Sequence, residues 1–348
     1  MNINFIGIFF VYINLLSCTS YPKTERKTSL KYPSSLVFTG YGKNSYTSGN
    51  VENYLNELSL LNANTATFLY SCQTKDLRSS NVDCDSPYTP SLHSMKMAIS
   101  MAKNRGYSVS VRHYIDVETK DWRCYWNPTD KPKAYLNIES KLISFSKLLE
   151  EFNVEHFTIG AEYCKLTTQE SNNDWKRIIS NIRKNFQGSI NYGANWETIE
   201  GENEFFETPI WSYVDNIGLD YYLPIPDNIP EEKFYKYQVG QFLNYSKLAT
   251  QYNKPIFINE IGFAGSSKGI SEPYEWRNKT PGSESRQAAA YRETLRALKS
   301  YKNVKGIFIW RKLAQNKYNM NIYNPNETGY ALWKRKAWYE IKKFFKTF

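Results

Sequence analysis

Short apolar segments alternate with longer amphipathic segments along most of this chain. The short segments are rich in β-branched and aromatic residues and are bounded by polar or turn residues, which is typical of strands. They lie at 35–42, 65–72, 108–116, 156–163, 189–196, 216–223, 255–263 and 304–311. The longer segments repeat apolar residues at steps of three and four, which predicts helices at 51–61, 91–105, 138–152, 175–186, 233–252, 284–302 and 334–347.

Strands that alternate with helices in this way predict an α/β fold, and eight strands predict a single (β/α)₈ TIM barrel. Such a barrel needs about 250 residues, which residues 35–348 of this chain supply. Residues 19–34 are polar and contain proline, so we interpret them as a tether. The pattern Thr167-x-x-Glu170 predicts a capping box before the fourth helix.

Strand alternation places polar and aromatic side chains inside the predicted barrel. In the third strand, Val109, Val111 and Ile115 share the face toward the helices. Arg112, Tyr114 and Asp116 share the opposite face and are expected to face the lumen. The sixth and eighth strands are interpreted in the same way. The residues expected inside the barrel mouth are Arg112, Tyr114, Asp116, Asp220, Tyr222, Phe308 and Trp310.

Two of the apolar strands carry a glutamate near their C-terminal ends, Glu162 in 156–163 and Glu260 in 255–263. A carboxylate at the end of an apolar strand is costly to desolvate unless it is used. Barrel enzymes place their chemistry at this end of the strands, and a carboxylate pair there is how a retaining glycosidase is built. Within 255–263, alternation predicts Ile256, Ile258 and Glu260 on one face and Phe257 and Ile261 on the other.

The segments around these strand ends resemble glycoside hydrolase family 113, retaining β-mannanases of the large (β/α)₈ glycosidase clan. The resemblance covers the chain from about Leu36 to the final helix. The matching segments are Asp121-Trp-Arg123, Gly160-Ala-Glu162, Tyr192-Gly-Ala-Asn-Trp196, Gly218-Leu-Asp-Tyr-Tyr222, Asn259-Glu-Ile-Gly262 and Gly306-Ile-Phe-Ile-Trp310.

The resemblance implies that Glu162 is the acid/base and Glu260 the nucleophile. It places Tyr222, Asn195, Trp196, Trp122, Arg123 and Trp310 in the substrate pocket. A retaining mechanism requires carboxyl groups about 5–5.5 Å apart, whereas inverting enzymes need about 6.5–9.5 Å, and we expect the shorter separation. Two neighbouring carboxyls do not both ionise easily, so Glu162 should keep its proton beside an ionised Glu260.

Some of these positions leave alternatives open. Tyr222 is placed to donate a hydrogen bond to Glu260, or else bonds the backbone. Trp310 and Trp196 either stack on sugar faces or pack in the core, and the alternation of its strand points Trp196 away from the lumen. The long connection 264–285 contains Tyr274 and Trp276, and we interpret it as a wall of the cleft.

The chain also departs from the family pattern. Ala161 stands where threonine is usual, Tyr114 replaces a histidine, Arg112-His113 stands for Lys-Pro, and Lys312 replaces a second tryptophan. These changes leave the sugar, the linkage and endo or exo action open. They also leave a second hypothesis, a carbohydrate-binding protein that has lost turnover. A hydrolase with a Ser/His or metal mechanism lacks its residue set.

Charge and composition narrow the classes of partner. The net charge is +10, from 44 Lys+Arg against 34 Asp+Glu, but the basic residues are scattered rather than gathered in a stripe, which argues against nucleic-acid binding. Aromatic residues make up 16% of the chain, as sugar-binding clefts favour. We expect a monomer that acts on an oligo- or polysaccharide without a cofactor.

The N-terminus predicts export. An apolar run from Phe5 to Leu16 is short for a membrane span and suits a signal peptide. Leu15-Leu-Ser-Cys18 resembles a bacterial lipobox, so residues 1–18 are expected to direct lipidation of Cys18 and attachment to the cell envelope. No Lys or Arg precedes the run, and ordinary cleavage or an uncleaved anchor are the alternatives.

Export permits disulfides among the remaining cysteines. Cys72 and Cys84 flank a polar loop and are the expected pair, with Cys124 and Cys164 as the alternative. No cysteine has zinc-type spacing, and the histidines, His93, His113 and His156, are dispersed. We therefore expect no metal site.

Overall fold

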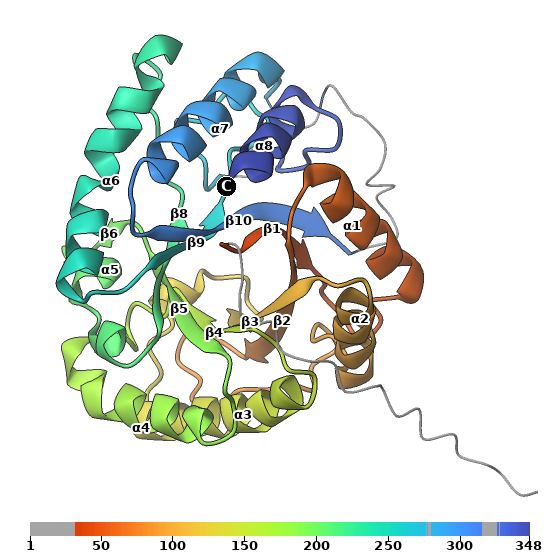
Figure 1. The fold of residues 1–348 in the computed structure, drawn as a ribbon. Helices are drawn as coiled ribbons and strands as arrows, with labels where there is room; N and C mark the ends of the chain where they lie inside the picture. Colours follow the sequence, from red (N-terminus) through yellow and green to blue (C-terminus); the bar gives the residue numbers. More distant parts are fainter. Residues whose placement is uncertain (1–31, 276, 278–279, 315–325, 327) are drawn as a thin grey trace, which may run out of the picture.

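The computed structural model describes residues 32–275, 277, 280–314, 326 and 328–348. The expected signal segment, Cys18, nearly all of the tether and Trp276 lie outside these residues. The described chain folds as a closed barrel of parallel strands surrounded by helices (Figure 1). The predicted single (β/α)₈ TIM barrel is therefore confirmed.

The barrel strands are ordered β1-β10-β9-β8-β5-β4-β3-β2 around the sheet. Their bounds are β1 (Ser34–Thr39), β2 (Thr65–Thr74), β3 (Ser108–Val117), β4 (His156–Ala161), β5 (Ser189–Asn195), β8 (Asn216–Tyr221), β9 (Ile256–Ile261) and β10 (Val304–Leu313). Their ends lie within two residues of the predicted strands, except that β1 ends three residues before the end of the predicted strand 35–42. The agreement is close because the apolar runs are bounded by clear turn residues.

The α-helices are α1 (Ser48–Leu61), α2 (Leu92–Asn104), α3 (Lys131–Glu151), α4 (Asn172–Arg183), α5 (Glu204–Glu207), α6 (Phe234–Gln251), α7 (Glu284–Lys299) and α8 (Lys336–Thr347). Single 3₁₀ turns are η1 (Arg123–Tyr125), η2 (Gln169–Ser171), η3 (Pro209–Ser212) and η4 (Glu231–Lys233). Within the described residues, no helix combines the length and hydropathy needed to cross a membrane.

The connection between β5 and β8 lacks a long helix. It contains a small hairpin, β6 (Thr198–Ile199) with β7 (Glu202–Asn203), followed by the single-turn α5 and by η3. Phe205 and Trp211 anchor it, since both are fully buried and the Trp211 indole donates to the Phe205 carbonyl at 2.7 Å. The short connection is thus fixed to the barrel by packing rather than by helix length.

The capping box predicted at Thr167 is wrong. Helix α4 begins at Asn172, and its N-cap, Ser171, makes no side-chain capping bond. The Thr167 hydroxyl instead lies 2.7 Å from the Glu204 carboxylate. A tertiary hydrogen bond therefore takes the hydroxyl that the local motif would have used.

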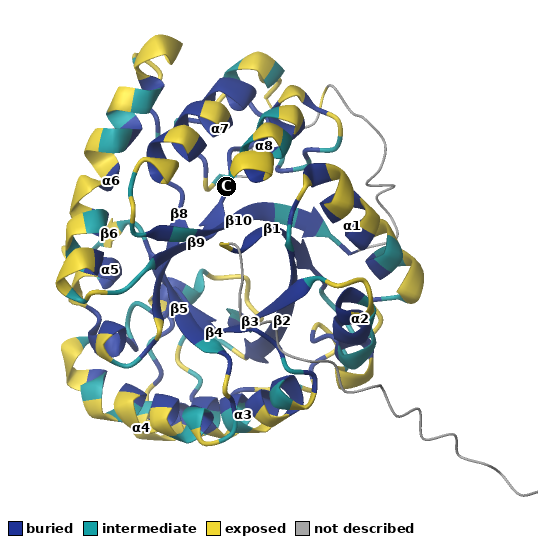
Figure 2. Cartoon of the chain, in the orientation of Figure 1, coloured by how far each residue is buried: buried dark blue, intermediate teal, exposed yellow. Residues whose placement is uncertain are grey.

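Apolar side chains pack on both sides of the barrel wall, and Figure 2 shows the strands buried and the outer faces of the helices exposed. An outer cluster between strands and helices includes Val109, Val111 and Ile115, as predicted. The buried members of the lumen cluster are Val37, Leu69, Tyr114, Ala161, Tyr222, Phe257, Ala264, Phe308, Trp310 and Tyr330. The faces predicted for Tyr114, Tyr222, Phe308 and Trp310 therefore agree with the structure.

The alternation predicted for β9 is wrong. Ile256, Ile258 and Ile261 all pack in the outer cluster. Phe257 packs in the lumen cluster, and Glu260 reaches the lumen with it, where it contacts Tyr222. Strict alternation would have put Phe257 and Glu260 on opposite faces.

A shift of register at Asn259 explains this arrangement. Leu219 of β8 pairs with Ile258, and the next residue, Asp220, pairs with Glu260, so Asn259 is skipped. An extra residue of this kind bends a strand and redirects the side chains around it. Asn259 and Glu260 both turn inward, and Asn259 Oδ1 accepts a hydrogen bond from Asn191 at 3.3 Å.

Lys312, at the position where the family usually has tryptophan, forms an ion pair with Glu57 of α1. The two side chains are only 5% and 4% exposed. Burial raises the pKa of Glu57, and the Lys312 ammonium opposes that rise. This lysine therefore stabilises the contact of β10 with α1 and does not stack in the cleft.

Removing one member of this pair should be more damaging than removing both. Lys312→Met leaves the Glu57 carboxylate buried without its cation and should lower the free energy of unfolding by about 3–5 kcal/mol. The double variant Glu57→Leu/Lys312→Met should recover most of that loss. Urea unfolding measures both, and a single variant within about 1 kcal/mol of wild type would contradict the assignment.

Candidate active site

Glu260 lies at the C-terminal end of β9, where groups from neighbouring strands hold its carboxylate. Tyr114 donates a hydrogen bond to Oε1, and Tyr222 donates one to Oε2 at 2.6 Å. The Arg112 guanidinium lies 3.4 Å from Oε1. Burial raises the pKa of Tyr114 and of Tyr222 well above the ordinary value for tyrosine. Each phenol therefore keeps its proton and acts as a hydrogen-bond donor. These contacts orient Glu260 as a carboxylate.

Arg112 is the cation at the centre of the lumen. Its side chain is 1% exposed, and Nη2 lies 3.0 Å from Asp220 Oδ1. Nη1 donates to the backbone oxygen of Asn259. Burial and the charge of Glu260 raise the pKa of Asp220 well above its usual range, and Arg112 opposes that rise. Arg112 thus offsets the buried negative charge of two carboxyl groups.

Glu162 immediately follows β4 and contacts a different set of donors. The Trp122 indole donates to Oε2 at 2.9 Å, and Arg123 Nη1 donates to the same oxygen at 3.0 Å. Burial raises the pKa of Glu162; Arg123 opposes the rise and the charge of Glu260 adds to it. The acid form of Glu162 therefore persists to higher pH than that of an exposed glutamate.

Arg123 is itself fixed by Asp116 at the end of β3. Arg123 Nη2 lies 2.5 Å from Asp116 Oδ1, and Ser71 donates to the other oxygen of Asp116. The guanidinium groups of Arg123 and Arg112 lie 4.6 and 5.0 Å from the centre of the Tyr114 ring. Tyr114 therefore connects the surroundings of the two glutamates.

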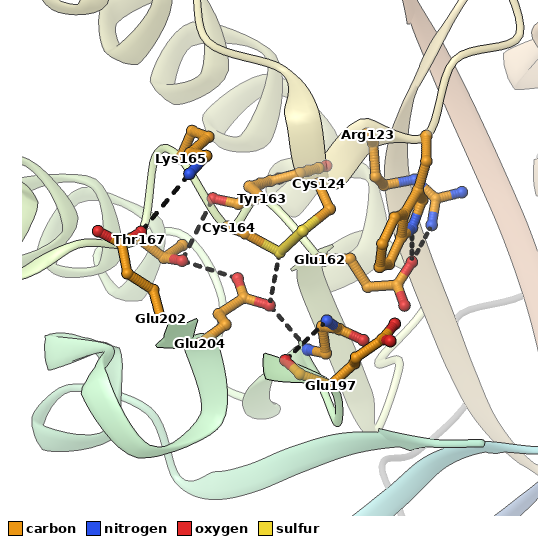
Figure 3. The surroundings of a disulfide bond; sticks show 12 residues. Arg123, Cys124, Glu162, Tyr163, Cys164, Lys165, Thr167, Glu197, Glu202 and Glu204 are labelled. Carbon is orange, nitrogen blue, oxygen red and sulfur yellow. Dashed lines mark hydrogen bonds and ion pairs between the residues drawn. A yellow bond between two sulfur atoms is a disulfide. The ribbon is translucent and has the colours of Figure 1, made fainter. Parts of the chain in front are cut away.

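Disulfides join both cysteine pairs that the sequence offered as alternatives. Cys72 is bonded to Cys84, and Cys124 is bonded to Cys164. The second bond lies beside Glu162 and Arg123, as Figure 3 shows. Cys124 directly follows Trp122 and Arg123 in sequence, and Cys164 is two residues after Glu162. The bond therefore ties the donors of Glu162 to the loop that carries Glu162.

Aromatic residues form a wall beyond the end of β5. Trp196 and Tyr274 stack with ring centres 6.2 Å apart, and Tyr274 is half exposed. Tyr330 packs against Tyr222 and donates to the backbone oxygen of Pro273, which fixes the loop after β9. The alternation predicted for Trp196 does not apply, because β5 ends at Asn195. Tyr274, in the described part of 264–285, thus stacks on Trp196, while Trp276 lies outside the described residues, and the role of this connection as a cleft wall stays a prediction.

Asn195 makes no hydrogen bond to Glu162 or Glu260 within the described part of the chain. It is fully buried; its side chain donates to the Glu197 carbonyl at 3.2 Å, and its backbone N–H donates to Glu204 at 2.7 Å. Burial raises the pKa of Glu204 to about 7. The side-chain oxygen of Asn195 has no hydrogen-bond partner among the described residues, and its place in the substrate pocket stays a prediction.

Several residues near the site were not among the candidates. Tyr41, just after β1, has its hydroxyl 3.4 Å from Arg311 and packs against the lumen cluster. Tyr330 and Asn259 also reach the lumen. Tyr41 falls within the predicted strand 35–42, so its position beside a glycine at a strand end was a usable signal. Tyr330 lies outside every predicted element and gave no signal.

A metal site has little basis in the described residues. The cysteine, histidine and carboxylate groups close enough to share an ion there are Cys72, Cys84 and His113. The sulfurs of Cys72 and Cys84 are already bonded to each other, so they are not thiolate ligands.

The sequence itself decides the family. Residues 37–335 match the model of Glycoside Hydrolase Family 113. The chain belongs to glycoside hydrolase family 113. The resemblance seen in the strand-end segments is therefore confirmed. A comparison with the curated proteins gives no match.

Solved structures share the fold at low sequence identity. A complex of a family 113 β-1,4-mannanase has a TM-score of 0.80 and 18% identity, over 92% of this chain and 100% of that one. The β-mannanase AaManA from Alicyclobacillus acidocaldarius has a TM-score of 0.78 and 16% identity, over 91% and 98%. A β-glucuronidase from Ruminococcus gnavus has 0.62 and 13%, over 90% of this chain and 50% of that one. These structural matches show the barrel alone.

The Cys124–Cys164 bond of this family 113 protein should be needed to hold the loop after β3. Replacing both cysteines by serine opens a loop with a sequence separation of 40 and should lower the free energy of unfolding by about 4 kcal/mol in the chain-entropy model. Hydrogen exchange should rise in residues 122–126 before the barrel unfolds globally.

The matched control is the same double serine change at Cys72 and Cys84. The disulfide that this change removes spans a sequence separation of 12, and neither cysteine is next to a candidate catalytic glutamate in the sequence. That variant should lose about 3 kcal/mol and raise exchange in 122–126 less than the first variant does, because its loop reaches this segment through the hydrogen bond from Trp126 to the Ser79 carbonyl and not through a covalent bond. Equal exchange in that segment for both variants would contradict the tie between Cys124 and the Glu162 loop.

Proposed function

We propose that this family 113 protein is a retaining glycoside hydrolase that cleaves β-linked saccharides of the β-1,4-mannan type. In the first step Glu260 attacks the anomeric carbon while Glu162 gives its proton to the departing glycosidic oxygen. In the second step Glu162 takes a proton from water, the water oxygen bonds to the anomeric carbon, and the ester bond to Glu260 breaks. The released sugar keeps its anomeric configuration.

The unequal surroundings of the two glutamates carry this proposal. Glu260 accepts hydrogen bonds from Tyr114 and Tyr222 and lies 3.4 Å from Arg112, all of which favour a carboxylate. The pKa of Glu162 is raised by burial and by the charge of Glu260. One group is prepared to attack and the other to donate a proton, which is the division of roles that glycosidic cleavage requires.

The substrate class rests on family membership and on the walls of the site. Family membership implies a saccharide, and the solved family 113 structures are described as β-mannanases. Trp310 is in the lumen cluster with 8% of its surface exposed, and Trp196 stacks on Tyr274 at the rim. Aromatic faces of this kind suit sugar rings.

Changing the two glutamates separately tests the assigned roles. Glu260→Ala should lower kcat by about 10⁴-fold or more on every substrate, because no nucleophile remains. Glu162→Ala should lose about 10²–10⁴-fold on mannobiose-type substrates and much less on dinitrophenyl glycosides, whose leaving group needs no proton. Azide should partly restore the Glu162→Ala variant.

The matched control is Glu293→Ala, which removes a buried carboxylate on α7 that pairs with Arg292 and Arg296. This variant should keep wild-type turnover. Wild-type rates in both Glu162→Ala and Glu260→Ala would refute the roles. A wild-type protein that binds saccharides on a mannan, glucan, xylan and aryl-glycoside panel without cleaving any would favour the non-catalytic alternative.

The pH profile should report the proton on Glu162. Because the pKa of Glu162 is raised, kcat/KM should hold to higher pH than an exposed glutamate allows and then fall as Glu162 loses its proton. Arg123→Gln removes a cation 3.0 Å from this carboxyl and leaves the nearby Asp116 carboxylate without its cation. Both effects raise the pKa further, so the alkaline limb should move up by about one pH unit or more. A downward move would contradict this account of Glu162.

We also propose that the protein is exported and attached to the cell envelope through a lipid on Cys18. The lipobox-like segment Leu15-Leu-Ser-Cys18 and the disulfides of the barrel support this, because disulfides persist in oxidising compartments. Intact-mass analysis of the native protein should show a chain that starts at Cys18 and carries a diacyl or triacyl adduct. Unmodified protein in the medium would contradict the anchor.

A further inference from the structure

A buried carboxylate, Glu204, lies behind the candidate active site at the start of α5. It is 6% exposed, and within the described residues no lysine or arginine forms an ion pair with it. Donors surround it instead. The Tyr192 hydroxyl lies 2.6 Å from Oε1, the Thr167 hydroxyl 2.7 Å from Oε1, and the Asn195 N–H 2.7 Å from Oε2. The site is built to fix a carboxylate in one place.

Two of these donors, Tyr192 and Thr167, also contact the backbone of Tyr163, the residue after Glu162. The Tyr192 oxygen accepts a hydrogen bond from the backbone N–H of Tyr163 at 2.6 Å. The Thr167 hydroxyl lies 3.2 Å from the Tyr163 carbonyl oxygen. The Tyr163 peptide groups are therefore connected to Glu204 through one side chain from β5 and one from the loop after β4.

The backbone at Glu162 requires such support. Its φ is +55°, in the left-handed region, where a residue with a Cβ costs about 1–2 kcal/mol. A strained residue persists only when its surroundings determine its conformation. The Glu162 N–H donates to the Gly193 carbonyl at 2.8 Å, and the next N–H, that of Tyr163, donates to Tyr192. Both bonds come from consecutive residues of β5.

Glu204 does not itself reach the two glutamates' donors. Figure 3 shows Glu204 on one side of the Cys124–Cys164 bond and Glu162, with Arg123, on the other. Cys164 Sγ lies 3.7 Å from Glu204 Oε2, and as half of a disulfide it has no proton to donate. The next residue, Phe205, is fully buried and anchors α5 against Trp211. The position of Glu204 is therefore fixed by the packing of Phe205 and by its own hydrogen-bond donors, and not by contacts with Trp122 or Arg123.

We propose that Glu204 and Tyr192 are positioning residues for Glu162. Glu204 fixes the Tyr192 hydroxyl, which fixes the peptide after Glu162 in its left-handed turn and so directs the Glu162 carboxyl at Trp122, Arg123 and the cleft. This inference rests on the acid/base role proposed for Glu162. The connection between β5 and β8 would then have a structural role in the active site, because α5 in this connection carries Glu204 to the Tyr192 hydroxyl.

The test compares Tyr192→Phe, Glu204→Ala and Glu204→Gln with a matched control, Tyr54→Phe. Tyr54 is also fully buried, accepts a hydrogen bond from a strand N–H, that of Thr67, at 2.8 Å, and donates to the Leu36 carbonyl at 2.7 Å. It lies between α1 and the barrel wall, away from both glutamates. The control therefore loses the same kind of hydrogen bonds without touching the Glu162 turn.

The first readout is the dependence of kcat/KM on the leaving group. Tyr192→Phe and Glu204→Ala should lose about 10- to 100-fold on phenyl and disaccharide substrates, and less than about threefold on dinitrophenyl glycosides, because only the former need the proton of Glu162. Glu204→Gln keeps an acceptor for Tyr192 and should fall between them and wild type. Tyr54→Phe should keep the wild-type ratio of kcat/KM between the two kinds of substrate, even if its melting temperature falls as much as that of Tyr192→Phe.

The second readout does not require turnover. Crystal structures of Tyr192→Phe and Glu204→Ala should show residue 162 out of the left-handed region, or its carboxyl away from Trp122 and Arg123. An unchanged residue 162 would overturn the inference whether or not the protein cleaves saccharides. Wild-type leaving-group ratios in an active protein would overturn it too. A wild-type protein with no turnover would count against the proposed function alone, and the crystal structures would still decide this point.

Discussion

Four carboxyl groups and two guanidinium groups share the mouth of this barrel, and the balance of charge among them constrains everything around them. Arg112 forms ion pairs with Glu260 and Asp220, and Arg123 forms ion pairs with Glu162 and Asp116. If every acid were ionised, the buried group would carry excess negative charge, which is costly away from water. Burial and mutual repulsion accordingly raise the pKa of Glu162 and Asp220. The need to limit buried negative charge thus favours a protonated Glu162 beside a Glu260 carboxylate that its hydrogen-bond donors hold in place.

The fold supplies this arrangement through the ends of its strands. Arg112, Tyr114 and Asp116 come from one face of β3, while Glu260 comes from the irregular end of β9. Tyr114 stands where the family usually has histidine, and it donates a hydrogen bond to Glu260. A phenol whose pKa is raised by burial stays a donor at any working pH, whereas a histidine would titrate. The departure from the family pattern therefore keeps Glu260 supported rather than removing its support.

The sequence predicted the barrel and the two glutamates because both depend on patterns that are local. Apolar runs marked the strands, and alternation correctly placed Tyr114 and Tyr222 in the lumen. Alternation failed in β9, because an extra residue at Asn259 is a property of strand pairing that one strand does not reveal. Thr167 looked like a helix cap until the structure placed Glu204 beside it.

Other features depend on contacts between distant residues and had no sequence signal. Glu204 lies in a connection without helical periodicity, so nothing in its neighbourhood marked it. Both disulfides form, although the sequence gave Cys124–Cys164 only as an alternative, since pairing depends on which loops the barrel brings together. The alternatives for Trp196 stay open because its position one residue past β5 is not governed by strand alternation; its ring stacks on Tyr274 and packs against both the outer and the lumen cluster.

The stereochemistry of the first product tests the central claim most directly, because only a covalent bond to Glu260 gives retention through two displacements. Proton NMR of a β-mannoside digest, recorded before mutarotation, distinguishes the anomers as they form. We predict that the β-anomer appears first and the α-anomer grows only as mutarotation proceeds. Initial release of the α-anomer would show single-step inversion by water and would contradict the role of Glu260 as nucleophile.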